Sequence, residues 1–239
     1  MIDLSKYLDI YDIRARLFPA LLSVLPVIVA IYLYMPSVFS AANELIAVFA
    51  GFGGVYLLAQ LARDRGKELE PGLYIKWGGM PSVNILRYRG AILPEVSLAR
   101  THQHLEKLSG IHAPTSDSER ADPAAADDIY KSWSDFLRSK TRDTTQFALL
   151  FKENISFGFR RNFLGLKPFT LFFTLMSALV AIVTNVEGEK IMLSTLDGTF
   201  LVLSLAYAIT VGLVVDERWV KTPADEYAKR LIEAVNDLE

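Results

Sequence analysis

The chain has 239 residues, of which 51% are hydrophobic and 22% are charged, and its formal net charge is −2. A soluble domain with this charge content rarely has a positive mean hydropathy, which here is +0.27. The chain contains no cysteine, which excludes disulfides, thiolate metal sites and thiol nucleophiles.

Four windows of the chain are free of Asp, Glu, Lys, Arg and His: residues 17–35, 45–61, 169–186 and 199–215. Each is close to the minimum length that a helix needs to cross a ~30 Å hydrocarbon core at ~1.5 Å per residue. A buried helix of a soluble protein is the alternative for any single window, but four together predict four transmembrane helices. Charged residues precede the first window and no small-residue cleavage site follows it, so we expect this span to stay in the mature protein.

The basic residues predict the orientation, because short loops rich in Lys and Arg stay in the cytoplasm. Lys190 is the only basic residue in the loops at 36–43 and 187–195. The other ends of the four spans are flanked, in chain order, by Lys6, Arg14, Arg16, Arg63, Arg65, Lys67, Arg160, Arg161, Lys167, Arg218 and Lys221. We therefore expect a multi-pass protein of the bacterial inner membrane with both termini and residues 62–168 in the cytoplasm.

Both ends of the chain are predicted to be amphipathic. In residues 1–16 apolar and charged residues alternate at helical spacings, so this segment lies along the membrane surface or packs on the cytoplasmic segment. A final helix opens at residues 222–225 and carries an apolar stripe of Tyr227, Leu231, Val235 and Leu238. The predicted fold is an all-α membrane protein with an interfacial segment (1–16), a transmembrane hairpin (17–61), a mainly helical cytoplasmic insert (62–168), a second hairpin (169–215) and a C-terminal amphipathic helix (216–239).

Small residues recur along the spans and predict close helix packing or an oligomer interface. They are Ala47, Gly51 and Gly54 in the second span, Ser177 and Ala181 in the third, and Ser204, Ala208 and Gly212 in the fourth. The lack of ionisable residues in the spans argues against an ion-coupled transporter. A pore lined by hydroxyl groups and small residues stays open as an alternative.

At the start of the insert, residues 73–77 are typical of a short strand or extended segment that enters a turn at Gly78-Gly79, and residues 83–88 begin a strand or a helix. The turn is also a candidate ligand site, because backbone N–H groups of glycines can cradle a phosphate. The residues of this candidate site are Lys76, Trp77, Gly78, Gly79, Arg87 and Arg89. Neither the P-loop nor the dinucleotide spacing is present, so a plain turn is the alternative, and a nucleotide or nucleic-acid ligand stays open.

Further along the insert, a helix is expected at 95–108 with Gly110 beyond its end, followed by a mobile polar loop at 113–122. Asp122-Pro123 then supply an N-cap and a first-turn proline for a second helix. Its predicted buried face consists of Ile129, Trp133, Phe136 and Leu137.

The histidines are the one cluster that resembles a metal or acid–base site: His102, His104 and His112, near Asp117 and Asp122. Residues two apart on a helix point ~200° away from each other, so His102 and His104 cannot chelate one ion. Packed or solvated histidines are the preferred interpretation. We expect no catalytic residue, no metal and no cofactor.

Four arginines are predicted to lie where the second and third spans leave the membrane: Arg63, Arg65, Arg160 and Arg161. There they would contact anionic lipid headgroups, with ~1 kcal/mol per basic residue. Retention of basic loops in the cytoplasm explains them equally well.

Two strings, Trp77-Gly78-Gly79-Met80-Pro81-Ser82 and NISFGFRRNFLGLKP at 154–168, resemble segments of uncharacterised bacterial four-helix inner-membrane proteins. The layout of four spans with a cytoplasmic module is similar to membrane effectors of antiphage defence systems. In those effectors a cytoplasmic signal or partner triggers membrane disruption. Our leading hypothesis is a non-enzymatic, oligomeric membrane component whose insert senses a ligand or a protein partner and alters the bundle, for example by opening a pore. The alternatives are a membrane anchor or scaffold that recruits a soluble enzyme, and an enzyme that acts on lipid or nucleotide.

Overall fold

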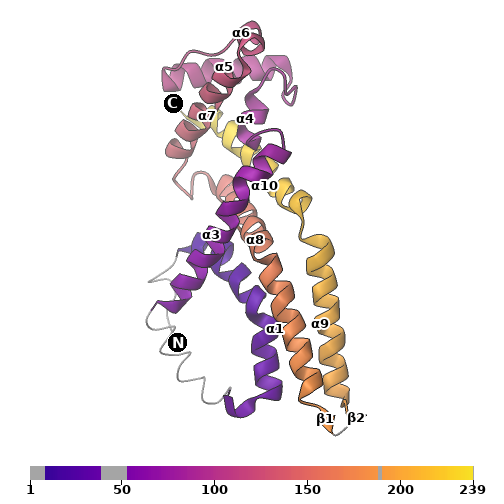
Figure 1. Ribbon diagram of the computed structural model, residues 1–239. Helices are drawn as coiled ribbons and strands as arrows, with labels where there is room; N and C mark the ends of the chain where they lie inside the picture. Colours follow the sequence, from indigo (N-terminus) through magenta and orange to yellow (C-terminus); the bar gives the residue numbers. More distant parts are fainter. Residues whose placement is uncertain (1–8, 39–52, 188–189, 239) are drawn as a thin grey trace. The chain divides into compact units, whose positions relative to one another are not determined.

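The computed structural model describes residues 9–38, 53–187 and 190–238, and nearly all of its elements are helices (Figure 1). In chain order they are η2 (Asp12–Leu17), α1 (Phe18–Tyr34), α3 (Gly54–Lys76), α4 (Pro81–Leu86), α5 (Glu95–Ser109), α6 (Ser116–Ala121), α7 (Pro123–Lys140), α8 (Ala148–Val183), β1 (Val186–Glu187), β2 (Lys190–Ile191), α9 (Thr195–Val214), α10 (Glu217–Glu233) and η3 (Ala234–Asp237). The two short strands pair antiparallel with each other. The predicted all-α class is confirmed.

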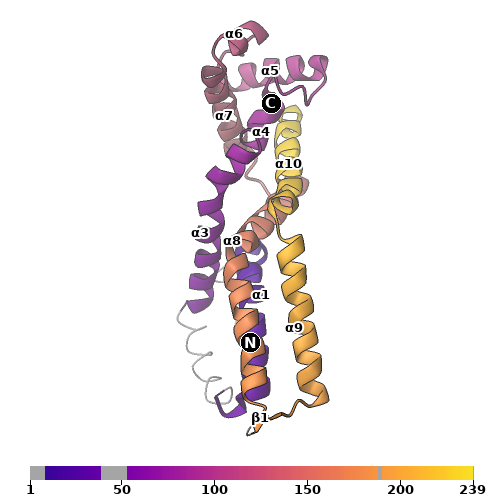
Figure 2. The ribbon, with the colours of Figure 1, turned by 45° about the vertical axis from the view of Figure 1, so that its right-hand side comes forward.

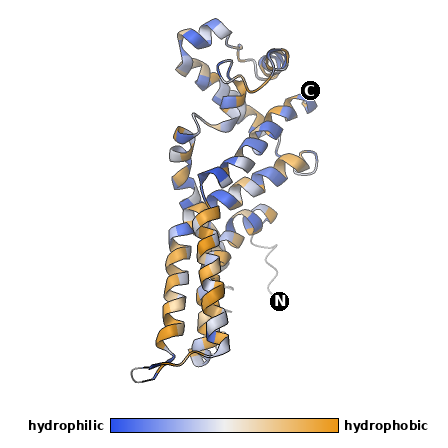
Figure 3. Ribbon diagram, turned by 90° about the vertical axis from the view of Figure 1, so that its right-hand side faces the viewer, coloured by the Kyte–Doolittle hydropathy of each residue, from blue (hydrophilic) through white to orange (hydrophobic). Residues whose placement is uncertain are grey.

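Among the described residues, three helices are long and apolar enough to cross a membrane: Asp12–Tyr34, Ala148–Val183 and Thr195–Val214. They contain most of the first, third and fourth predicted spans, and hydrophobic residues cover the helices on both sides of the β1–β2 turn (Figure 3). Residues 45–52 of the second predicted span lie outside the described residues, and its remainder belongs to the start of α3. Three helices of this kind indicate a membrane protein.

The chain divides into two compact units. Unit 1 consists of Met1–Leu69 and Gly158–Val220, and unit 2 consists of Glu70–Phe157 and Lys221–Glu239. The chain passes from one unit to the other inside α3, α8 and α10, since the bounds of each of these helices include residues of both units. Each unit has its own buried core.

In unit 1, α1, α8 and α9 lie side by side (Figures 1 and 2). Ala30, Ala181 and Phe200, one from each helix, form a shared buried cluster. Small side chains at such contacts let helix backbones approach closely. The predicted small-residue faces are only partly buried, because Ser177, Ala181 and Ser204 are buried whereas Gly212 is exposed, and Ala47 and Gly51 lie outside the described residues.

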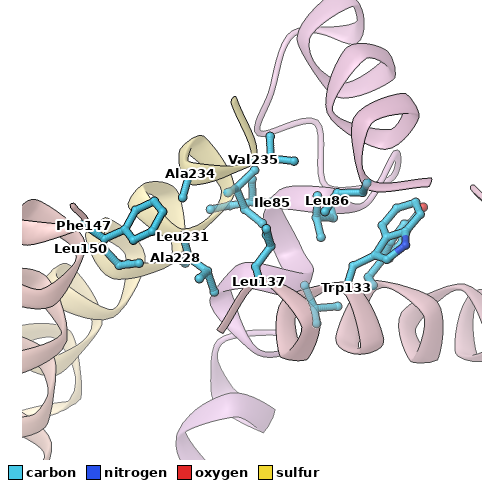
Figure 4. Packing of buried hydrophobic residues seen from close by; sticks show 14 of the residues in the cluster. Ile85, Leu86, Trp133, Leu137, Phe147, Leu150, Ala228, Leu231, Ala234 and Val235 are labelled. Carbon is cyan, nitrogen blue, oxygen red and sulfur yellow. The ribbon is translucent and has the colours of Figure 1, made fainter. Parts of the chain in front are cut away.

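The core of unit 2 contains residues of α4, α5 and α7 together with residues of α10 and η3 at the C-terminal end of the chain (Figure 4). Trp133 and Leu137 of α7 are fully buried, as the apolar spacing of this helix predicts, and Ile129 and Phe136 are partly buried. On the other side of the core, Leu231 and Val235 are buried too. The predicted apolar stripe of the C-terminal helix therefore packs into the core of unit 2.

The prediction of a strand at 73–77 is wrong. These residues continue α3 through Lys76, and Leu73 is buried in the last part of the helix. Alternating apolar and polar residues favour a strand locally, but each residue added to an existing helix gains a hydrogen bond without a new nucleus. The predicted turn follows directly, because Gly78 and Gly79 both have positive φ, 74° and 135°. Residues 83–86, left open between strand and helix, belong to α4.

The predicted mobile loop at 113–122 is also wrong in its central part. Residues Ser116–Ala121 form α6, which begins with a capping box between Thr115 and Ser118. Two neighbouring predictions are confirmed: α5 ends at a left-handed Gly110 (φ 71°), and the Asp122 side chain caps α7. A polar composition therefore does not distinguish a loop from a short, capped surface helix.

Candidate functional site

The predicted glycine-turn site lies in unit 2 between α3 and α4. The Asn84 side chain donates to the carbonyl oxygens of Trp77 (3.1 Å) and Gly79 (3.3 Å), and Arg87 Nη1 donates to the carbonyl oxygen of Gly78 (2.5 Å). A Cβ atom at Gly79 would lie 2.5 Å from Asn84 Oδ1. These side chains hold the turn through its carbonyl groups.

The two arginines of the candidate site face carboxylates. Arg87 binds Asp127 in a bidentate manner, with Nε–Oδ1 at 2.8 Å and Nη2–Oδ2 at 2.6 Å. Arg89 bridges Asp127 (2.6 Å) and Glu119 (2.9 Å). Burial raises the pKa of Asp127, but its hydrogen bonds with the arginines outweigh burial and hold that pKa below 3.8. The positive charges are thus balanced within unit 2, which favours a structural role for Arg87 and Arg89 over phosphate binding.

Glu119 of α6 is the centre of this network, and only 2% of the residue is exposed. Its carboxylate accepts from the backbone N–H groups of Tyr88 (2.9 Å) and Arg89 (3.0 Å), from the Arg89 guanidinium (2.9 Å) and from the Tyr130 hydroxyl (2.7 Å). Burial raises the pKa of Glu119, but these four donors outweigh burial and hold its pKa below 4.5. Glu119 is therefore a buried anion that fastens segment 87–89 to α6 and α7.

His102 lies inside an aromatic cluster rather than at a surface. Its ring centroid is 5.0 Å from that of Tyr88, 5.4 Å from that of Tyr130 and 5.2 Å from that of Trp133. Burial lowers the pKa of His102, so the ring is neutral and its Nε2 donates to the carbonyl oxygen of Leu86 (2.8 Å). The histidine cluster is not brought together, because His112 is exposed and pairs with Glu106 (2.8 Å).

A groove of ≈ 520 Å³ lies beside this network, between α5 and α10. It is lined by Pro81, Asn84, Ile85, Ile92, Leu93, Ser97, Arg100, Thr101, Lys221, Asp225, Glu226, Lys229, Ile232, Glu233 and Asn236. Its apolar lining residues are Pro81, Ile85, Ile92, Leu93 and Ile232, of which Ile92 is exposed and Ile85 and Ile232 are buried. Two walls carry charges, of which Lys221 and Asp225 pair with each other (2.5 Å). A groove with an apolar base and charged walls suits a peptide segment better than a small anion.

The four predicted interface arginines lie in unit 1 and have different surroundings. Arg160 donates to the carbonyl oxygen of Trp219 (2.9 Å) and lies 5.0 Å from the centroid of its indole. Arg161 is only 4% exposed and donates to Asn162 Oδ1 (3.0 Å). Arg63 and Arg65 are half-exposed and pair with the acidic residues Asp64 (3.7 Å) and Glu68 (3.1 Å).

Asn162 marks a close crossing of three helices near these arginines. Its amide donates to the carbonyl oxygen of Ala15 in η2 (2.7 Å). A Cβ atom at Gly66 of α3 would lie 2.0 Å from Asn162 Oδ1, and one at Gly165 of α8 would lie 2.7 Å from the backbone carbonyl of Arg65. The two glycines therefore permit a contact between helix backbones that no larger residue fits.

No protein-family model, curated protein or solved structure matches the chain.

Two features of the sites, the Glu119 network and the groove between α5 and α10, are not predicted from the sequence. Glu119 lies in a stretch rich in Ser, Asp and Pro, and the one available signal was the spacing of Thr115 and Ser118 that caps a helix. The groove is made by segments more than one hundred residues apart in the chain, such as Arg100 and Lys229. No local pattern can predict such a surface.

Proposed function

We propose that the chain is a non-enzymatic component of the bacterial inner membrane, with four spans and with unit 2 in the cytoplasm. The three long apolar helices support membrane insertion, and the basic residues that flank the spans support this orientation. The outward surface of α9 is apolar, as lipid contact requires, with Val202, Leu203, Leu205, Ile209 and Leu213 all exposed.

Unit 2 binds a soluble protein partner, and the groove between α5 and α10 is the observation that carries this proposal. The partner segment is an amphipathic helix, because the groove combines exposed Ile92 and partly buried Leu93 with charged walls. The exposed charges that line the groove have both signs: Arg100 and Lys229 are basic, and Glu226 and Glu233 are acidic. The polar face of the segment therefore carries charges of both signs, including a carboxylate that meets Arg100.

Binding of the partner in this groove changes the packing of the helices of unit 1, so the protein acts as a sensor. The groove is built partly on α10, and α10 contains residues of both units. A scaffold that recruits a soluble enzyme would use the same groove without a change in the bundle. A pore draws less support from the described helices, because the hydroxyl groups of Ser23, Thr170 and Ser177 are buried and hydrogen-bonded inside unit 1.

The groove is tested by placing a photo-reactive benzoylphenylalanine at Ser97, which lines it, or at Ser132, an exposed serine of α7 outside it. We expect irradiation in cells to give a discrete protein adduct from Ser97 only. Arg100→Glu should weaken this adduct about tenfold, the equivalent of ~1.4 kcal/mol in binding.

Equal adducts at both serines, or no effect of Arg100→Glu, would contradict the proposed groove. An adduct with the mass of two copies of the chain would show that a second copy of the chain, and not a soluble partner, occupies the groove. With the partner identified, an unchanged membrane potential on co-expression would favour the scaffold over a pore.

A further inference from the structure

A cleft of ≈ 280 Å³ lies within unit 1 between α1, α3 and α8. It is lined by Ala20, Ser23, Val24, Leu58, Leu61, Ala62, Arg65, Leu166, Phe169 and Phe173. The volume is near the lower end of the ~300–1,000 Å³ found for small-molecule pockets. All lining residues except Ser23 and Arg65 are apolar, so the walls suit a hydrocarbon ligand.

The hydroxyl group of Ser23 is already engaged inside the helix bundle. It donates to the carbonyl oxygen of Pro19 (2.8 Å) and accepts from Thr170 Oγ1 (2.9 Å). Among the described residues that line the cleft, Arg65 is therefore the one strong partner for a polar ligand.

Arg65 is placed on one wall of the cleft by a contact with its lining. The guanidinium lies 5.3 Å from the ring centroid of Phe169, and half of the side chain, 50%, is exposed. Its Nη1 pairs with Glu68 at 3.1 Å, and the Glu68 side chain is itself 63% exposed. A guanidinium has five N–H donors, so this single contact leaves donors for a phosphate.

Arg65 also belongs to the group of arginines that the sequence places where spans leave the membrane. That level is where the phosphate of a phospholipid lies, while its acyl chains extend into the apolar region. The cleft extends from Arg65 and Phe169 to residues nearer the middle of the apolar windows, such as Phe173 and Leu58. The phosphate of one lipid thus matches the Arg65 guanidinium, and its acyl chain matches the apolar walls of the cleft.

We propose that this cleft is a binding site for an anionic phospholipid, with an acyl chain between α1, α3 and α8 and the phosphate on Arg65. The site rests on the proposed membrane insertion but is independent of the groove in unit 2. An anionic lipid held there links three helices of unit 1.

The test uses the full chain, extracted in mild detergent from membranes that retain it after alkaline carbonate washing, so that failed insertion is recognised separately. Native mass spectrometry then counts lipid adducts with phosphatidylglycerol or phosphatidylcholine of identical acyl chains. We expect a preference of about tenfold for phosphatidylglycerol, the size of one charge-assisted contact. Arg65→Gln should abolish the preference, whereas Arg63→Gln, the same change outside the cleft, should keep it.

A second pair of variants tests the acyl chain. Leu61 and Leu57 of α3 are equally exposed, 52% each, but only Leu61 lines the cleft. Leu61→Trp should fill the cleft and reduce adducts of both lipids, and Leu57→Trp should leave them unchanged. Equal lipid binding by Leu61→Trp and Leu57→Trp would overturn the site, as would the absence of a headgroup preference or its equal loss in Arg65→Gln and Arg63→Gln.

Discussion

Replacement of Glu119 by alanine is expected to destabilise unit 2 by about 3 kcal/mol, because it removes the buried acceptor of several hydrogen bonds. The substitution leaves two backbone N–H groups and the Tyr130 hydroxyl without their acceptor, and it leaves Arg89 with Asp127 alone. Each buried donor left unsatisfied costs about 1–3 kcal/mol. Segment 87–89 should therefore detach from α6, while Arg87 and Arg89 still bind Asp127 of α7.

The fluorescence of Trp133, whose indole ring lies 5.2 Å from His102 in the same cluster, reports this loss during urea unfolding of the full chain in detergent, with the other two tryptophans, Trp77 and Trp219, replaced by Phe in every variant. Asp117→Ala is the matched control, because its side chain is 92% exposed on the same helix. The control should change stability by no more than about 0.5 kcal/mol. Similar destabilisation by both substitutions would show that the Glu119 network contributes nothing beyond α6 itself.

The same network predicts how stability changes with pH. The folded-state pKa of Glu119 is lower than its ordinary value of 4.5, so its stabilising contribution is complete above pH 4.5 and is lost as pH falls through the folded-state value. Glu119→Gln should weaken this acid-dependent loss.

Replacement of Gly165 by alanine is expected to destabilise unit 1 by about 1–3 kcal/mol, the usual cost of overpacking. The new Cβ would lie 2.7 Å from the backbone carbonyl of Arg65 and 2.9 Å from the backbone nitrogen of Gly66. Backbone atoms of a helix cannot rotate away as a flexible side chain can. Helices α3 and α8 must therefore separate at this crossing.

Gly212→Ala in α9 is the control, because nothing lies within 4 Å of the added Cβ. Alanine in a helix interior should stabilise the chain there by about 0.5–1 kcal/mol. Thermal unfolding in detergent measures both variants. A Gly165→Ala variant as stable as Gly212→Ala would mean that α3 and α8 do not approach each other this closely.

The features that could be predicted from the sequence are those with a local physical cause. A bilayer core excludes charge, and within the described residues the helices long and apolar enough to span it include most of three of the four uncharged windows. Asp122 and Gly110 are residue types typical of a helix start and a helix end, and the structure has them there. The strand prediction for residues 73–77 is wrong because the alternation of apolar and polar residues there is outweighed by the continuation of the preceding helix. The role of Glu119 could not be predicted for a different reason: its hydrogen-bond partners, at 88, 89 and 130, are distant from it in the chain.

The candidate sites were harder to predict than the fold. Arg87 and Arg89 resemble anion ligands in sequence, and only the positions of Asp127 and Glu119 show that carboxylates balance them. The groove and the lipid cleft are surfaces between helices, and their shape depends on how distant segments pack. Sequence patterns identify the charges but not which of them meet.

The central claim, four spans with unit 2 in the cytoplasm, is tested most directly by cysteine accessibility, since the chain has no cysteine of its own. Single cysteines are placed at the exposed residues Ser37, Asp128 and Glu187, and intact spheroplasts are treated with a membrane-impermeant maleimide. We expect labelling at Ser37→Cys and Glu187→Cys, and at Asp128→Cys only after lysis, which requires a crossing between residues 37 and 128. Labelling of Asp128→Cys in intact spheroplasts, or protection of Ser37→Cys, would contradict this topology.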